Sequence, residues 1–378
     1  MKLFDVYPLY DVTPVRAKDV FVYDENGNEY LDLYGGHAVI SIGHGHPHYI
    51  NKINHQLHEI GFYSNAIQNP MQQKLADAIG EHSCCYEYQL FLCSSGAEAN
   101  ENALKLASFH TGKKRVIAFH NAFHGRTSAA VAATDNPNIV APLNAQQEVT
   151  FLPFNDEVAL ENELKKGDVC AVIFEAIQGV GGLDSPKKKF IMAMETLCNT
   201  YNACLIADEV QSGFSRTGTF FAFQKYRINP HIITIAKGMG NGFPIGGILV
   251  HPTIEPKYGL LGTTFGGNHL ACAASLAVLD VLKEEKLQDN AHQMGAYFIE
   301  KAKTIAQIKK IKGRGLMLGF EFDFEVGELR KKLIYTHGIF TGGSSNKKLL
   351  RILPPLTIQK RQIDFFFTQL EIALNTTT

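Results

Sequence analysis

The sequence predicts an α/β protein with a mostly parallel central sheet between layers of helices, together with a smaller α+β lobe. Two observations support this prediction. Between about residues 89 and 250, short apolar runs alternate with helix-like stretches, which is typical of parallel strands joined by crossover helices. After about residue 270 the alternation stops, and a long helical pattern leads into "GLMLGFEFDF" and "LLRILPPLTI".

The expected elements follow the chain in order. Near the N-terminus, "VFVYDENGNEYLDL" predicts a hairpin that turns at "ENGN". Helix-like stretches such as "EANENALKLASFHTG" and "KKFIMAMETLCNTYN" separate several strands, and 270–306 predicts a long connecting helix. We predict an N-terminal segment of the small lobe at 1–55, a large domain at 56–265, and a C-terminal small domain at 266–378. The predicted sheet strands are 89–93, 115–119, 170–175, 204–210, 232–236 and 246–250.

Composition argues against several classes of protein. The 378-residue chain has a formal net charge of −1, which gives no electrostatic case for binding nucleic acid or an anionic membrane. No stretch approaches the roughly 20 apolar residues of a membrane span, and the N-terminus lacks the apolar core of a signal peptide. The seven cysteines form no metal-like CxxC pattern, and the glycines and proline of "GHGHPH" (43–48) favour a turn over a metal cluster. We expect a cytoplasmic protein with reduced thiols and no metal.

A turn of small residues links the 89–93 strand to the helix after it. Ser95, Gly96 and Ala97 would present free backbone N–H groups at a helix N-terminus, which is a natural site for a phosphate. The same residues also suit an ordinary capped helix, with a serine N-cap and Glu98 in the first turn. The pattern is not GxxxxGK[ST], so it does not indicate a nucleotide P-loop.

The loop after the 115–119 strand, "HNAFHGRTSAA", combines an aromatic and a basic side chain. Phe123 can stack on a planar cofactor, and Arg126 can bind a carboxylate with two parallel hydrogen bonds. In isolation, a surface loop with an incidental arginine explains the pattern equally well.

Two charged residues stand at the ends of buried strands. Asp208 follows the apolar residues of "CLIADEV", and Lys237 follows "IITIA" and precedes several glycines. A buried acid pairs with a cation, a metal or a protonated ring nitrogen. A metal is disfavoured here, because no histidine or cysteine lies nearby at ligand spacing. A desolvated lysine can form a Schiff base with an aldehyde. With the phosphate turn, these residues predict a pyridoxal 5'-phosphate site beyond the carboxyl ends of the strands.

Several motifs, in order along almost the whole chain, resemble those of the class III (subgroup II) aminotransferases. The resemblance is nearest to the acetylornithine and succinylornithine branch, with the ornithine and 4-aminobutyrate enzymes as cousins. It implies the fold-type I architecture of pyridoxal-phosphate enzymes and a homodimer with shared active sites. The matching stretches are "SSGAEANENALKLA", "AFHGRT", "DEVQSGFSRTG", "AKGMGNGFPIGG" and "GTTFGGNHLACAAS".

The resemblance implies a role for each matched residue. Lys237 would bond the cofactor and carry a proton, and Asp208 would pair with the ring nitrogen. Arg126 would bind the substrate α-carboxylate and Arg351 another carboxylate. The remaining implied cofactor contacts are Ser95, Gly96 and Ala97 at the phosphate, Phe123 and Val210 on the ring faces, Gln211 at the ring hydroxyl, and Thr264 at the phosphate from the partner subunit.

The implied reaction moves the δ-amino group of an N-acylated ornithine to 2-oxoglutarate and gives glutamate, as in arginine biosynthesis. Two alternatives of the same chemistry stay open: an ornithine or 4-aminobutyrate aminotransferase, and another pyridoxal-phosphate reaction on the same scaffold. A third alternative is a non-catalytic relative that serves as a binding protein. The intact Lys237 and Asp208 argue against this last reading.

One motif departs from the family pattern. "EAIQGVGG" has Val180 where the family usually has a glutamate, and that glutamate pairs with the arginine matched here by Arg351. Without it, Arg351 should be permanently available to a carboxylate and should repel an approaching ammonium. We therefore expect an altered balance of donors, unless another acid takes its place. A large acyl group with its own carboxylate, such as succinyl, would suit Arg351.

Overall fold

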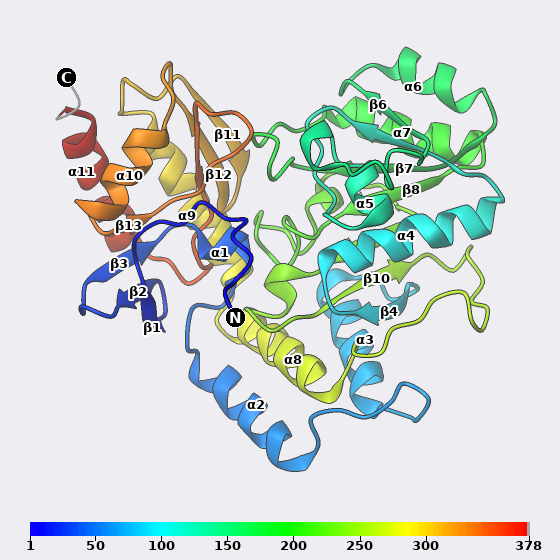
Figure 1. The fold of residues 1–378 in the computed structure, drawn as a ribbon, viewed down its shortest axis with the longest axis horizontal. Coiled ribbons are helices and arrows are strands. Elements are labelled where there is room, and N and C mark those ends of the chain that lie inside the picture. The colour runs from blue at the N-terminus through cyan, green and yellow to red at the C-terminus, as the bar shows by residue number, and fades with distance from the viewer. Residues whose placement is uncertain (376–378) are drawn as a thin grey trace.

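Figure 1 shows the fold of the computed structural model, which describes residues 1–375 as a large and a small group of strands with helices around them. The large group is one seven-stranded sheet with the order β4-β10-β9-β8-β7-β5-β6. β10 runs antiparallel to both of its neighbours, and the other four pairs are parallel, which confirms the predicted mostly parallel sheet. The strands are β4 (Gln89–Cys93), β5 (Arg115–Phe119), β6 (Val149–Leu152), β7 (Val169–Glu175), β8 (Cys204–Asp208), β9 (Ile232–Ile235) and β10 (Gly246–Val250).

Sequence and structure differ at two places in this sheet. The strand predicted at 204–210 ends at Asp208, because the next residues turn back on it: the Val210 N–H donates to the Asp208 side chain at 3.0 Å. β6 was not predicted. It lies at the sheet edge, its first three residues are only half-buried, and its short run "VTFL" therefore lacks the apolar signal of the inner strands.

Helices cover both faces of the sheet. Side chains alternate along β8, so that Leu205 and Ala207 join one hydrophobic core and Ile206 the other. α4 (Gly96–Thr111) packs on the face of Ile206, and α7 (Lys188–Thr200) packs on the opposite face. Within residues 1–375 no helix is long and apolar enough to cross a membrane. The other helices near this sheet are α3 (Pro70–Ser83), α5 (Ser128–Ala132) and α6 (Glu157–Leu164).

Both ends of the chain build the smaller group. β1 (Pro14–Lys18), β2 (Phe21–Asp24) and β3 (Glu29–Asp32) form an antiparallel meander, and β13 (Ile339–Phe340) adds to it parallel to β3. The β2–β3 connection confirms the predicted hairpin at "ENGN". The domain bounds given above stay a prediction. This group also contains a second sheet of β11 (Lys310–Arg314), β12 (Met317–Glu321) and β14 (Leu349–Ile352), and the helices α10 (Gly327–Tyr335) and α11 (Lys360–Asn375).

The predicted long helix at 270–306 is wrong, because the structure divides it into two. α8 (His269–Glu284) ends where Lys286 adopts a left-handed conformation with φ +52°, and α9 (Leu287–Ala302) starts in a new direction. The break carries no glycine or proline, so the sequence pattern runs through it without a signal. α8 packs against α3 and against α2 (Pro47–Glu59), which places the start of the C-terminal part beside the N-terminal part.

The histidines of "GHGHPH" each find a carboxylate partner. These pairs attach the turn to β3 and to the C-terminal end of α8. Among the residues that the structure describes, no three metal-ligating side chains come together. The pairs are His44 with Asp32 at 2.9 Å, His46 with Glu285 at 2.8 Å and His48 with Asp280 at 2.8 Å.

Arg216 joins the N-terminal, central and C-terminal parts of the chain. Its guanidinium is buried and donates to the backbone carbonyls of Ile40 at 3.2 Å and Leu316 at 3.1 Å, and also to that of Pro354. A buried cation held by carbonyl oxygens is satisfied only when all three segments are in place. Arg216 therefore fixes the small strands relative to the loop after β8.

Candidate active site

The carboxyl ends of the parallel strands open onto a cavity of about 370 Å³. This is the edge of a parallel sheet where ligands normally bind. All of the predicted site residues except Arg351 and Thr264 line the cavity. The lining residues among them are Ser95, Gly96, Ala97, Phe123, Arg126, Asp208, Val210, Gln211 and Lys237.

The N-terminus of α4 agrees with both interpretations of the small-residue turn. Ser95 is the N-cap, since its hydroxyl accepts the N–H of Glu98 at 3.2 Å, and the Glu98 carboxylate accepts the N–H of Ser94 at 2.6 Å. The N–H groups of Gly96 and Ala97 fall in the first turn, where the helix supplies no acceptor, and both residues line the cavity. The capped helix and the anion site therefore coexist.

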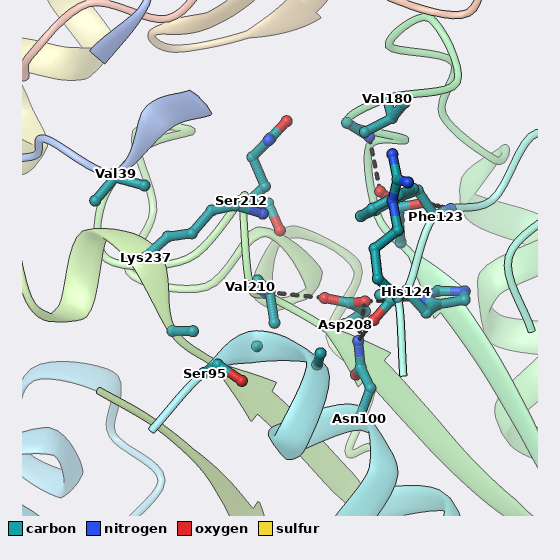
Figure 2. Close-up of a pocket in the computed structure, with 18 of the residues that line it drawn as sticks. Val39, Ser95, Asn100, Phe123, His124, Val180, Asp208, Val210, Ser212 and Lys237 are labelled. Atoms are coloured by element: carbon teal, nitrogen blue, oxygen red, sulfur yellow. Dashed lines mark hydrogen bonds and ion pairs between the residues drawn. The ribbon is translucent and has the colours of Figure 1, made fainter. Parts of the chain in front are cut away.

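Asp208 is buried and held by a polar network (Figure 2). Its Oδ2 accepts from Asn100 at 2.8 Å and lies 2.7 Å from Nδ1 of His124, while Oδ1 accepts the Val210 N–H at 3.0 Å. The network satisfies the carboxylate oxygens, because each partner can donate to them. Sequence reasoning missed Asn100 and gave His124 no role, although His124 stands inside the "AFHGRT" motif.

Lys237 lies just beyond β9, across the cavity from Asp208 in Figure 2. Its backbone has φ +48°, and the following turn is held by Ser41, whose hydroxyl donates to the Gly238 carbonyl at 2.7 Å. Burial lowers the pKa of Lys237, and the attraction of Asp208 and Glu175 opposes this only in part. A lowered pKa increases the share of lysine that is the neutral, nucleophilic amine.

Two buried glutamates follow the strands and have different surroundings. Glu175 ends β7 and lines the cavity; its oxygens accept the N–H of Phe123 at 3.0 Å and of Gly179 at 2.7 Å. Glu209 lies outside the cavity lining. Burial raises the pKa of each carboxyl to about 7. Glu175 shares the strand-end position of Asp208, a signal that could have identified it from sequence. Glu209 accepts from Ser212 at 2.6 Å, Ala222 at 2.9 Å and Phe223 at 2.8 Å.

Arg351 is buried on β14, behind the cavity wall. Its Nη1 donates to the Gly179 carbonyl at 2.7 Å and lies 3.5 Å from Oε1 of Gln211. Burial lowers the pKa of Arg351 to about 10, so it stays a cation at neutral pH. Within residues 1–375, no carboxylate oxygen lies within 4.0 Å of its guanidinium nitrogens. No acidic side chain in contact with Arg351 therefore takes the place of the glutamate that the family pattern has at position 180.

The two other predicted substrate and partner residues lie at the periphery. Arg126 lines the cavity with an exposed side chain. Thr264 is exposed and lies in a loop that does not line the cavity of its own chain. Its neighbour Phe265 is also exposed and contacts Phe62, with ring centroids 5.5 Å apart.

A left-handed turn near Lys237 and Arg351 was not predicted. Its four residues, 35–38, have φ between +54° and +69°, which is costly for the two that are not glycine. The His37 ring packs on Tyr34, whose hydroxyl lies 2.8 Å from Nε2. The ring is open to the solvent on one side, yet partial burial, with Arg351 and Lys237 nearby, lowers the pKa of His37 to about 4. His37 is therefore neutral at physiological pH.

The cavity residues fit pyridoxal phosphate. The first turn of α4 offers N–H groups to a phosphate, and Asp208 offers a buried negative charge to a protonated ring nitrogen. Lys237 has no hydrogen-bond partner for its amine among the described residues, so the amine is free to bond an aldehyde. Gly96 packs closely against Val210, since a Cβ at Gly96 would lie 2.6 Å from the Val210 side chain.

Comparisons with known proteins identify the family of the chain. The family model "Aminotransferase class-III" matches residues 6–374. Acetylornithine aminotransferase of Bacillus subtilis is 37% identical, over 98% of this chain and 97% of its own length. The ornithine aminotransferase structure from Toxoplasma gondii has a TM-score of 0.91 at 30% identity, over 98% of this chain and 92% of that one. A second structure of the T. gondii enzyme, with a TM-score of 0.89 and 30% identity over 97% of this chain and 90% of that one, is described as having partial occupancy of PLP at its active site. With this match and this fold, the chain belongs to the class III aminotransferases and is a pyridoxal-phosphate-dependent transaminase of fold-type I.

Proposed function

We propose that the protein moves the δ-amino group of an N-acylated ornithine to 2-oxoglutarate, giving the N-acyl glutamate semialdehyde and glutamate, in arginine biosynthesis. The relatives named acetylornithine aminotransferase support this class of donor. The observation that carries the proposal is Arg351, a buried cation behind the cavity wall with no carboxylate in contact among residues 1–375.

The residues of the cavity divide the work of amino transfer. Bound pyridoxal phosphate supplies an aldehyde that bonds amines and a ring that accepts electrons. Lys237, a buried amine of lowered pKa, would hold the cofactor and would serve as the base that moves the proton of the donor carbon. Asp208, fixed by His124 and Asn100, keeps a negative charge at the ring nitrogen. Donor and acceptor react in separate half-reactions, so we expect ping-pong kinetics.

The charge on the α-amine of the donor, which is not transferred, explains why we propose a donor that is acylated there. Free ornithine carries an α-ammonium as well as a carboxylate, and the unpaired Arg351 repels that ammonium in a poorly solvated site. Acylation removes the charge of the α-amine and leaves a neutral amide, which Arg351 does not repel. The acceptor 2-oxoglutarate brings two carboxylates, for which Arg126 and Arg351 are the available cations.

The direct test is to measure glutamate formed from 2-oxoglutarate with N-acetylornithine, N-succinylornithine, ornithine or 4-aminobutyrate as donor. We expect kcat/KM for one acylated ornithine to exceed that for ornithine by about tenfold or more. A higher value for N-succinylornithine than for N-acetylornithine would assign the second carboxylate to Arg351. Preference for ornithine or 4-aminobutyrate would contradict the proposal.

Substituting Val180→Glu should shift the donor preference. Val180 lines the cavity beside Gly179, whose carbonyl binds Arg351, so a carboxylate there can neutralise the guanidinium while an ammonium enters. We expect kcat/KM for ornithine to rise by about tenfold relative to that for the acylated donor. Val180→Gln, with similar size and no charge, is the control and should leave the ratio close to that of the wild type. Unchanged relative rates in Val180→Glu would refute the role of the missing charge.

We also propose a homodimer in which Thr264 reaches the phosphate in the cavity of the partner subunit. Exposed apolar side chains beside this loop support an interface. The change Thr264→Ala should raise the Kd for the cofactor about tenfold, because one hydrogen bond to a charged phosphate is lost. Sedimentation should show a dimer for both proteins; a monomer, or an unchanged Kd, would contradict the shared site. The exposed side chains are Phe62, Tyr63, Ile67, Tyr258 and Phe265.

A further inference from the structure

Glu175 joins two loops at the edge of the sheet. It is the last residue of β7, is 7% exposed, and stands in register with Asp208 on β8, so both side chains leave the sheet on the same face. One carboxylate oxygen accepts the N–H of Phe123, in the loop after β5, at 3.0 Å. The other accepts the N–H of Gly179, in the loop after β7, at 2.7 Å.

Each of these loops carries a different part of the site. Phe123 forms the aromatic wall of the cavity. Gly179 holds the Arg351 guanidinium, because the Gly179 carbonyl accepts a hydrogen bond from Arg351 at 2.7 Å. Gly179 also packs closely against the Gln211 amide, since a Cβ at Gly179 would lie 2.3 Å from Oε1 of Gln211. The contacts thus run from the aromatic wall through Glu175 and Gly179 to the carboxylate-binding arginine.

We propose that Glu175 is a positioning residue that sets the distance between the cofactor wall at Phe123 and the substrate-binding guanidinium of Arg351. The part that concerns substrate rests on the proposed function; the part that concerns the cofactor does not. A second hydrogen bond joins the two loops, from the Gln178 side chain to the His120 carbonyl at 2.7 Å, and we expect it to keep the loops together when Glu175 is changed. We therefore expect loss of Glu175 to shift the two loops relative to each other without unfolding them.

The chain provides a matched control in Glu209. Like Glu175 it is a buried glutamate at the sheet edge that accepts two backbone N–H groups, but it fastens the loop at 212–223 and does not line the cavity. In both Glu175→Gln and Glu209→Gln an amide replaces one acceptor oxygen, so one backbone N–H in each loses its partner. The two variants should lose similar stability, which a thermal unfolding midpoint measures.

The decisive measurements are the Kd of the apo-protein for pyridoxal phosphate, by absorbance titration, and the separate kcat and KM for 2-oxoglutarate. For Glu175→Gln we expect the Kd and the KM each to rise about tenfold while kcat falls less than about threefold. For Glu209→Gln we expect both constants to stay within about twofold of the wild type. Glu175→Asp, which keeps the charge but is too short to reach both loops, should show the same pattern and replaces Glu175→Gln if that variant fails to fold.

Two results would overturn the proposal. If the Glu175 variants lose stability but keep the wild-type Kd and KM, the carboxylate only fastens loops. If Glu209→Gln raises the same constants equally, the effect is general loosening of the sheet edge. The cofactor titration needs no donor, so a failure of the N-acylornithine proposal leaves this part of the test intact.

Discussion

Replacing Lys237 with alanine is expected to lower kcat for amino transfer by more than about 10³-fold, because we propose that this side chain supplies both the covalent bond to the cofactor and the proton transfer. The structure supports both roles: the pKa of Lys237 is lowered by burial, and the side chain reaches into the cavity opposite Asp208. Borohydride reduction followed by peptide mass analysis should find the cofactor on the peptide that contains Lys237 in the wild type.

Lys113→Ala is the control for this prediction. Lys113 is also partly buried and donates to the carbonyls of Tyr201 and Asn202, both at 2.7 Å, but it does not line the cavity. Its loss should affect stability and leave kcat close to the wild-type value. If borohydride reduction of Lys237→Ala labels a peptide with the cofactor, or if the variant turns over within tenfold of the wild type, another amine bonds the cofactor.

Asp208→Asn should lower kcat by about 10²- to 10³-fold, because the neutral amide no longer stabilises positive charge on the cofactor ring nitrogen. The amide also disrupts the network, since its NH₂ group cannot accept from both His124 and Asn100 as the carboxylate does. The measurement is the rate of the first half-reaction with an acylated ornithine. Glu209→Gln serves here too as the control, being the adjacent buried carboxyl; equal rates for the two variants would contradict the role of Asp208.

The residues that could be predicted from sequence are those placed by the strands. Asp208 and Lys237 follow apolar runs, and the carboxyl ends of parallel strands meet at one edge, so their convergence follows from the pattern. The same holds for Phe123 and for the turn at Ser95, each directly after a strand. For these residues, the positions of the strands in the sequence are enough to predict that the side chains lie close together.

The residues that escaped prediction depend on contacts between distant segments. His124 and Asn100 matter because they meet Asp208, which lies 84 and 108 positions away in the sequence. The role inferred for Glu175 comes from two loop amides whose positions no periodicity describes. The left-handed turn at 35–38 includes two residues that are not glycine, and the helix break requires a positive φ at Lys286, so the apolar pattern of the sequence predicts neither.

The central claim, a transaminase for an acylated ornithine, is tested most directly by the visible absorption spectrum of the cofactor-loaded protein. N-acetylornithine, N-succinylornithine, ornithine and 4-aminobutyrate are added separately, without an acceptor. We expect one acylated ornithine to abolish the yellow band, 2-oxoglutarate to restore it, and ornithine to act only at much higher concentration. A yellow band that none of the four donors changes, or that ornithine abolishes as readily as the acylated donors, would contradict the account.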